Sequence, residues 1–148
     1  MNNALTLRFK KIHPDAVTPE YKTAGAAGFD LALVDDATIP PRSFVKAHTG
    51  IIVQVPDGHF LLIASRGSNP GKKGITLANS IGVLDWDYRG PNDEVMLCLE
   101  NITDAEVHLS KGDRVAQGLV LPVPTVTLEE ITGEIIEADR GGFGTTGK

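Results

Sequence analysis

Apolar residues along this chain come in short runs that glycine and proline interrupt at regular intervals. The runs are rich in Val, Ile, Leu and Thr, which favour extended backbone. No segment repeats apolar residues at helical spacing over more than two turns, so we expect no long helices. The expected strands are 5–9, 29–34, 44–55, 60–64, 75–84, 95–99, 106–109 and 115–123.

Turn chemistry between these runs favours a single all-β domain. Residues 40–41 (PP), 56–58 (PDG) and 110–113 (SKGD) combine proline, which presets φ, with glycine, which accepts positive φ. Many short strands in one unit predict a jelly-roll-like β-sandwich or barrel with at most short helical segments. We expect this β domain to span residues 1–136. The glycine-rich segment 137–148 cannot build a packed element unaided, and we expect it to form a flexible tail.

Charge and composition exclude some classes of partner. The chain has 148 residues, with 14 Lys and Arg against 19 Asp and Glu, and its net charge of −5 disfavours broad nucleic-acid binding. A local basic pocket for a small phosphate stays compatible with that charge. The longest unbroken apolar run, 60–64, is too short to cross a membrane. The only cysteine, Cys98, lies in an apolar run, so we expect it to be buried in a protein of the reducing cytoplasm.

Asp85 is the candidate for acid–base chemistry. It follows an apolar strand and precedes a turn that ends in glycine, which would hold its carboxylate within reach of a water molecule. Two alternatives stay open from the residues alone. Asp85 could merely cap a turn, or it could form a metal-binding pair with Asp87, two residues along the same strand.

Other polar segments contain groups suited to phosphate oxygens. Arg66 and Ser68 lie in a glycine-bearing loop, where cations and backbone N–H groups could surround a polyphosphate. In the tail, Arg140 is a candidate phosphate clamp, and Phe143 could stack on a flat base. The alternatives are a solvated charged loop and a disordered terminus.

Taken together, five segments in this order resemble the five motifs of the trimeric dUTPase family, from about Gly25 to the C-terminus. They are GFD at 28–30, SRGSNPGKKG at 65–74, NSIGVLDWDYRG at 79–90, GDRVAQG at 112–118 and RGGFGTTG at 140–147.

The resemblance implies hydrolysis of dUTP to dUMP and pyrophosphate, with Asp85 as general base and Asp87 as a structural residue. It also implies that the hairpin backbone reads the edge of uracil and that Tyr88 packs under the deoxyribose. Asp30 would lie near Mg²⁺ without direct ligation. The implied substrate-binding residues are Arg66, Gly67, Ser68, Asn79, Gly82, Val83, Leu84, Tyr88, Gln117, Arg140, Phe143, Gly144 and Thr145.

Departures from the family pattern concern contacts near the phosphates and the hairpin. The usual motif R-S-[GS] reads Arg66-Gly67-Ser68 here, so Ser68 or a backbone N–H must replace the serine hydroxyl. Arg140 directly precedes Gly141, although family members usually carry R-G-x-G-G-F-G. Trp86 stands where a small or polar residue is usual, and residues 91–93 lengthen the following turn.

The resemblance further implies a homotrimer with shared active sites and Mg²⁺ as cofactor. The net charge and the short apolar runs predict no nucleic-acid or membrane partner. Such an enzyme limits uracil incorporation into DNA and supplies dUMP for thymidylate synthesis. Three alternatives stay open: a dCTP deaminase, for which the chain looks short; a non-catalytic nucleotide sensor; and a jelly-roll structural subunit without a pocket. A regulatory protein partner of an active enzyme is a further open question.

Overall fold

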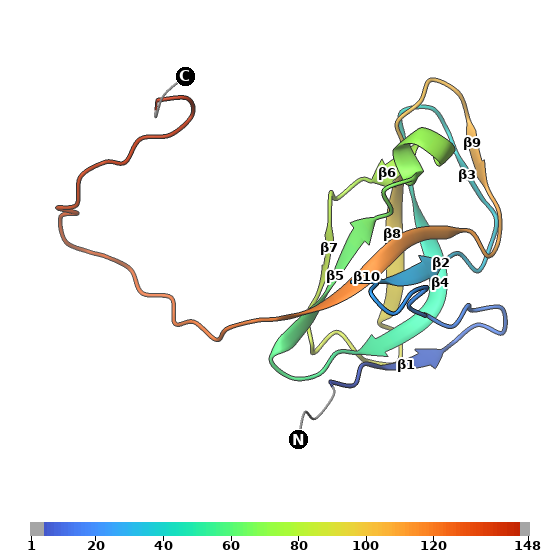
Figure 1. Cartoon of the computed structure of the whole chain (residues 1–148), viewed down its shortest axis with the longest axis horizontal. Coiled ribbons are helices and arrows are strands. Elements are labelled where there is room, and N and C mark those ends of the chain that lie inside the picture. The colour runs from blue at the N-terminus through green and yellow to red at the C-terminus, as the bar shows by residue number, and fades with distance from the viewer. Residues whose placement is uncertain (1–4, 146–148) are drawn as a thin grey trace.

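The computed structural model describes residues 5–145, and its regular secondary structure is almost entirely β-strand (Figure 1). Two four-stranded sheets enclose one hydrophobic core, and a two-stranded ribbon lies beside them. The predicted jelly-roll-like sandwich is therefore confirmed, as is the lack of long helices. The elements are β1 (Arg8–Lys11), β2 (Phe29–Ala32), β3 (Ala37–Ile39), β4 (Phe44–Gln54), β5 (His59–Ser65), a π-helical turn η1 (Asn69–Lys73), β6 (Ile75–Leu77), β7 (Gly82–Leu84), β8 (Glu94–Asn101), β9 (Val107–Leu109) and β10 (Arg114–Pro122).

Every pairing between neighbouring strands is antiparallel. The first sheet has the order β1-β4-β8-β6, and the second has the order β2-β10-β5-β7. The strands β3 and β9 form the ribbon. Sequence neighbours are thus often separated in space, and the predicted site segments end up on different strands of the second sheet.

Strand β8 shows why the pattern folds this way. Its residues alternate between half-buried and buried, and Val95, Leu97 and Leu99 point into the core with exposures of 0–1%. The fourth inward residue is Asn101, whose side-chain amide donates to the carbonyls of Ile39 and Ala105 at 2.9 and 2.7 Å. A buried amide is tolerated here because its donors and acceptor are satisfied.

Gly50 lies at an irregular point of β4, next to the end of its antiparallel pairing with the N-terminal strand β1. Its φ is +68°, and its carbonyl accepts from the Ile12 amide at 2.8 Å. A Cβ at this position would come within 2.7 Å of Val34 Cγ1 and 2.8 Å of His13 Cβ. Both the backbone conformation and the close approach therefore require glycine.

Several sequence-based boundaries were wrong for local reasons. The expected strand 75–84 is divided, because residues 78–81 turn between β6 and β7 and Ser80 adopts a φ of +62°. The three-residue strand β3 was missed because its run is too short to show a period. Cys98 is half-buried rather than buried, since it lies on the outward side of β8. The turns at 40–41, 56–58 and 110–113 are all present.

Beyond β10, the chain leaves the sandwich and extends away from it (Figure 1). Residues 123–145 contain no strand or helix, and their large apolar side chains have little of the chain around them. None of the described helical segments has the length and hydropathy needed to cross a membrane. The exposed apolar residues of this segment are Val123, Val126, Leu128, Ile131, Ile135, Ile136 and Phe143.

Candidate functional site

Five of the predicted site residues gather around one polar cavity of about 370 Å³. Asp30 comes from β2 and Gln117 from the adjacent β10, where the two residues are directly paired. Arg66, Gly67 and Ser68 follow the end of β5, which pairs with the other edge of β10. The pairing register of β10 with β2 and β5 thus brings three segments that are remote in sequence into one concavity. We call this concavity the phosphate pocket. It is completed by Lys22, Thr23, Ala26 and Gly28.

Asp30 is the electrostatic centre of the phosphate pocket. Its Oδ1 lies 3.1 Å from Arg66 Nε, and its Oδ2 accepts from Arg114 at 2.9 Å. Arg66 also donates from Nη1 to the Arg114 carbonyl at 3.1 Å. The carboxylate is only 15% exposed, so this arrangement fixes the direction of the Arg66 guanidinium.

Gln117 is held by a second set of contacts that runs through Ser65. The Gln117 amide donates to the Ser65 carbonyl at 3.1 Å, and buried Asn69 donates to Ser65 Oγ at 3.1 Å and to the Val115 carbonyl at 2.6 Å. Asn69 therefore ties the loop after β5 to β10. Its own Oδ1 is buried without a partner among the described residues.

The hairpin residues line a different cavity, of about 180 Å³. Val83 and Leu84 belong to β7, and Asp85 begins the tight turn that follows, in which the Tyr88 amide donates to the Asp85 carbonyl at 3.1 Å. Glu94 and Met96 of β8 provide the other wall. We call this cavity the hairpin pocket.

Tyr88 and Glu94 connect the two walls of the hairpin pocket. The Tyr88 hydroxyl donates to the Glu94 carbonyl at 3.2 Å. The Glu94 carboxylate in turn lies 2.9 Å from His48 Nδ1 and accepts from the Gly50 amide at 2.7 Å. These contacts fix the Tyr88 ring relative to the β8 wall of the pocket.

The two pockets lie at opposite ends of β5. In the β5–β7 pairing, Gly82 is opposite Ile63 and Leu84 is opposite Leu61, so Asp85 continues toward Phe60. Arg66 follows the other end of β5, six residues from Phe60, and a strand rises about 3.3 Å per residue, which separates their backbones by about 20 Å. Asp85 therefore cannot act on a phosphate held by Arg66 of the same chain.

The remaining hairpin residues line neither pocket. Asn79 is exposed in the turn before β7. Gly82 is buried, and a Cβ there would come within 2.9 Å of Ile63 Cβ, so its backbone packs closely on β5. Asp87 lines neither pocket. The Arg89 guanidinium carbon lies 4.9 Å from the centroid of the Trp86 ring, and Trp86 is 44% exposed.

The tail residues lie far from both linings within the chain. Arg140, Phe143, Gly144 and Thr145 contribute to neither pocket, and Phe143 is fully exposed. They form a local turn in which Thr145 Oγ1 accepts from the Gly142 amide at 2.7 Å. Thr146 lies outside the described residues.

Sequence reasoning missed Lys22 and Thr23 in the phosphate pocket and Glu94 and Met96 in the hairpin pocket. The first pair lies in the segment YKT just before the GFD motif, so its proximity to the motif was the available signal. The second pair lies on the central strand β8, where alternation predicted only core and surface positions.

The residues present offer little direct ligation for a metal. Within 5–145, no three His, Cys, Asp or Glu side chains gather as a metal-binding group. Both Asp30 oxygens already form ion pairs with arginines. A divalent cation that arrives with a polyphosphate fits this chain better, because Mg²⁺ keeps water and phosphate oxygens as ligands.

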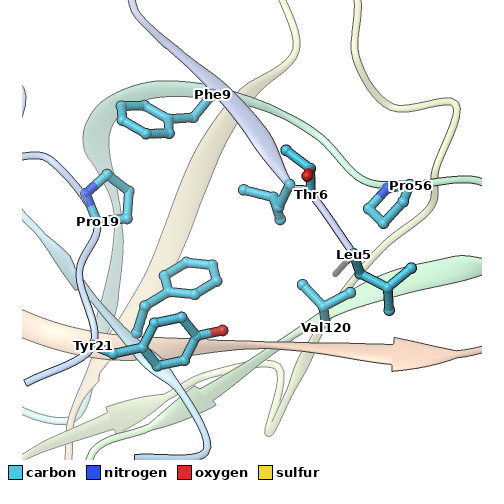
Figure 2. Close-up of a pocket in the computed structure, with 9 residues that line it drawn as sticks. Leu5, Thr6, Phe9, Pro19, Tyr21, Pro56 and Val120 are labelled. Atoms are coloured by element: carbon cyan, nitrogen blue, oxygen red, sulfur yellow. The ribbon is translucent and has the colours of Figure 1, made fainter. Parts of the chain in front are cut away.

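A further cavity, of about 460 Å³, is mainly apolar and is lined by none of the predicted site residues (Figure 2). Leu5 and Phe9 from the N-terminal segment face Tyr21 and Val120 across it. Convergent polar groups are typical of reactive sites, so the phosphate pocket and the hairpin pocket are the better candidates for the functional site.

Comparison with known proteins identifies the family of this chain. The dUTPase family model matches residues 15–147. The deoxyuridine 5'-triphosphate nucleotidohydrolases of Hydrogenobaculum sp. and Wolinella succinogenes are 42% and 40% identical, over 97% of this chain and 99% and 95% of their own lengths.

Solved structures show the same fold. A dUTPase from Streptococcus mutans superimposes with a TM-score of 0.74 at 35% identity, covering 80% of this chain and 98% of that one. A dUTPase of Staphylococcus bacteriophage 80alpha, solved with dUPNHPP, covers 97% of this chain and 99% of its own with a TM-score of 0.84, and at 21% identity it supports the fold alone. The chain described here belongs to the dUTPase family.

Proposed function

We propose that this dUTPase hydrolyses dUTP with a water molecule activated by Asp85, in a site that two or more copies of the chain build together. Hydrolysis would yield dUMP and pyrophosphate. The role expected in a cytoplasmic setting is to limit uracil incorporation into DNA and to supply dUMP for thymidylate synthesis.

The separation of the two pockets along β5 is the observation that supports a site shared between copies of the chain. Arg66, Ser68 and Gln117 line one pocket, whereas Asp85 and Tyr88 line the other, about 20 Å away by strand rise. One nucleotide can meet both sets only if the phosphate pocket of one copy faces the hairpin pocket of another. A closed ring of three copies satisfies this head-to-tail requirement and supports the predicted homotrimer.

The C-terminal segment supports the participation of a neighbouring copy. Leu128, Ile136 and Phe143 are 94%, 87% and 113% exposed, and apolar groups gain free energy when they leave water. Five of the 19 acidic residues lie in 123–139, without any lysine or arginine. In the proposal, the segment crosses to another copy, where Arg140 contacts phosphate and Phe143 covers the base.

Base recognition falls to the backbone of the β7 hairpin. Its N–H and C=O groups cannot rotate away, because Gly82 packs directly on Ile63. Cytosine exchanges the donor and acceptor at the pyrimidine 4-position, so it would leave buried groups unpaired at about 1–3 kcal/mol each. Tyr88, held by Glu94, would pack under the deoxyribose and leave no room for a 2′-hydroxyl.

The phosphate pocket would hold the triphosphate. Arg66 provides charge from a direction that Asp30 fixes, and Gln117 and Ser68 provide neutral donors. Mg²⁺ bound to the phosphate oxygens would neutralise further charge. Neutral donors near the reacting phosphorus avoid an ion pair that would occupy Asp85.

Asp85 would act in the hydrolytic step itself. Its carboxylate takes a proton from water as the water oxygen attacks the α-phosphorus in line. The bond from the α-phosphorus to the bridging oxygen breaks, and that oxygen leaves with pyrophosphate. Chemistry of this kind depends on positioning and electrostatics.

The test is the variant Asp85→Asn. We expect kcat for dUTP to fall by about a thousandfold, in the range for loss of a general base, while the affinity for a non-hydrolysable dUTP analogue is kept. Asp87→Asn, two residues away and outside both pockets, is the matched control. Near-normal pyrophosphate release by Asp85→Asn would overturn the assignment. Parallel assays with dCTP, dTTP and UTP separate this activity from deamination and from nucleotide sensing.

A further inference from the structure

A lysine that no motif contains lies in the lining of the phosphate pocket. Lys22 belongs to the loop before β2 and shares the cavity with Arg66, Ser68 and Gln117. We infer that Lys22 is a phosphate-binding residue, and that Glu20 holds its ammonium group until a triphosphate enters. This inference rests on the proposed function and adds a binding residue to the same site.

Arg66 alone leaves the pocket short of available positive charge. Its guanidinium is committed to Asp30 at Nε and to the Arg114 carbonyl at Nη1. Arg114 shares the same carboxylate, so one acid already offsets part of the charge of two arginines. A triphosphate brings several negative charges, and it requires cations that can turn toward it.

The two lysines that follow β5 do not provide this charge. Lys73 pairs with Asp113 at 3.1 Å, and neither Lys72 nor Lys73 lines the pocket. Both lie in the π-helical turn η1, beyond the buried anchor Asn69. Lys22 is therefore the cation of the pocket lining that is not tied to the strands.

Lys22 can change partner at little cost. Its ammonium group contacts Glu20 Oε1, and the two side chains are 46% and 60% exposed. Ion pairs at this exposure contribute little to stability. A phosphate oxygen in the pocket can therefore replace the Glu20 carboxylate as the partner of the lysine.

The backbone that carries Lys22 is nevertheless fixed relative to the pocket. The Asp30 amide donates to the Glu20 carbonyl at 3.2 Å, and the Ala26 amide donates to the Thr23 carbonyl at 3.2 Å. The first bond ties the loop to β2 at Asp30, and the second closes a turn within the loop next to Lys22. The lysine thus combines a positioned backbone with a side chain that is free to move.

Single variants test the contact by steady-state kinetics. In Lys22→Ala, we expect KM for dUTP to rise about tenfold with kcat changed less than twofold, because the lost contact is to a bound phosphate rather than to the reacting atoms. Lys22→Arg should stay within about threefold of the wild type. Lys11→Ala removes an exposed lysine from β1, outside this pocket, and should leave KM unchanged.

The pair with Glu20 provides a second, independent readout. Glu20→Gln should lower KM severalfold, since Lys22 then has no competing carboxylate. In the Lys22→Ala background, Glu20→Gln should change KM at most slightly. If Glu20 instead acted by repelling the triphosphate directly, Glu20→Gln would lower KM in that background as well. The thermal midpoint should stay at the wild-type value in all of these variants.

Direct binding separates this inference from the proposed function. Calorimetric titration with inorganic pyrophosphate and Mg²⁺ needs no turnover, and the Kd should rise about tenfold in Lys22→Ala but not in Lys11→Ala. Affinity for dUMP should change less than twofold. An unchanged KM and pyrophosphate Kd in Lys22→Ala, equal losses for dUMP and pyrophosphate, or no pyrophosphate binding by the wild type would each overturn the inference. Failure of dUTP hydrolysis would instead contradict the proposed function.

Discussion

Gly28 and Gln117 approach so closely across the β2–β10 pairing that a Cβ on Gly28 would lie 3.1 Å from Gln117 Oε1. The same Cβ would lie 3.1 Å from the Gly118 carbonyl, which belongs to the backbone of a central strand. The glutamine side chain is therefore the group that must move if residue 28 gains a side chain. The same side chain donates to the Ser65 carbonyl at 3.1 Å, so a shift of Gln117 would disturb this hydrogen bond.

Gly28→Ala should consequently damage catalysis more than folding. We expect kcat/KM for dUTP to fall by about tenfold to a hundredfold, because a small displacement of a positioning group is costly. Stability should fall by about 1–2 kcal/mol, as for a modest overpacking. Steady-state kinetics and urea unfolding measure the two effects. Gly25→Ala, in the same loop with open space around its Cβ, is the control; equal damage in both variants would contradict the explanation.

Gly67, unlike Gly28, has room for a side chain. Nothing lies within 4 Å of the Cβ position, so Gly67→Ser should fold without strain and place a hydroxyl in the phosphate pocket. We expect KM for dUTP to fall about fivefold, the effect of one added hydrogen bond to a charged group. Ser68→Ala should raise KM, and Gly67→Ser in that background should restore it. If neither change alters KM, neither hydroxyl position contacts the substrate.

Mixed assemblies can test whether Arg66 and Asp85 act from different copies. Arg66→Ala and Asp85→Asn should each be inactive alone, but co-refolded mixtures should regain activity. If two copies build each site and mix randomly, about a quarter of the sites combine two intact halves. Activity of the mixture is compared with that of each variant refolded alone. A mixture as inactive as its components would place both residues in one chain's site.

Much of the architecture could be predicted from the sequence because strand formation leaves a local signal. The alternation in β8 and the proline and glycine turns at 56–58 and 110–113 are visible in a few consecutive residues. Short or interrupted elements lacked that signal. The strand β3 has three residues, and the division between β6 and β7 depends on a turn with Ser80 at positive φ.

The candidate residues were named from five motifs, but their arrangement was not predictable in the same way. Strand pairing places Gln117 beside Asp30 and Ala64, and these residues are far apart in the sequence. Lys22 and Glu94 were missed because nothing in their local pattern separates them from other charged loop or strand residues.

The all-β class, the turns and the set of polar segments could be read from consecutive residues, since each depends on side-chain chemistry or a period of two along the chain. The tertiary fold was needed to place these segments in two cavities at opposite ends of β5. It also decided that Asp30 binds two arginines rather than standing open to a cation. The physical reason is that pairing register and sheet order are set by contacts across the whole core, which no single segment encodes.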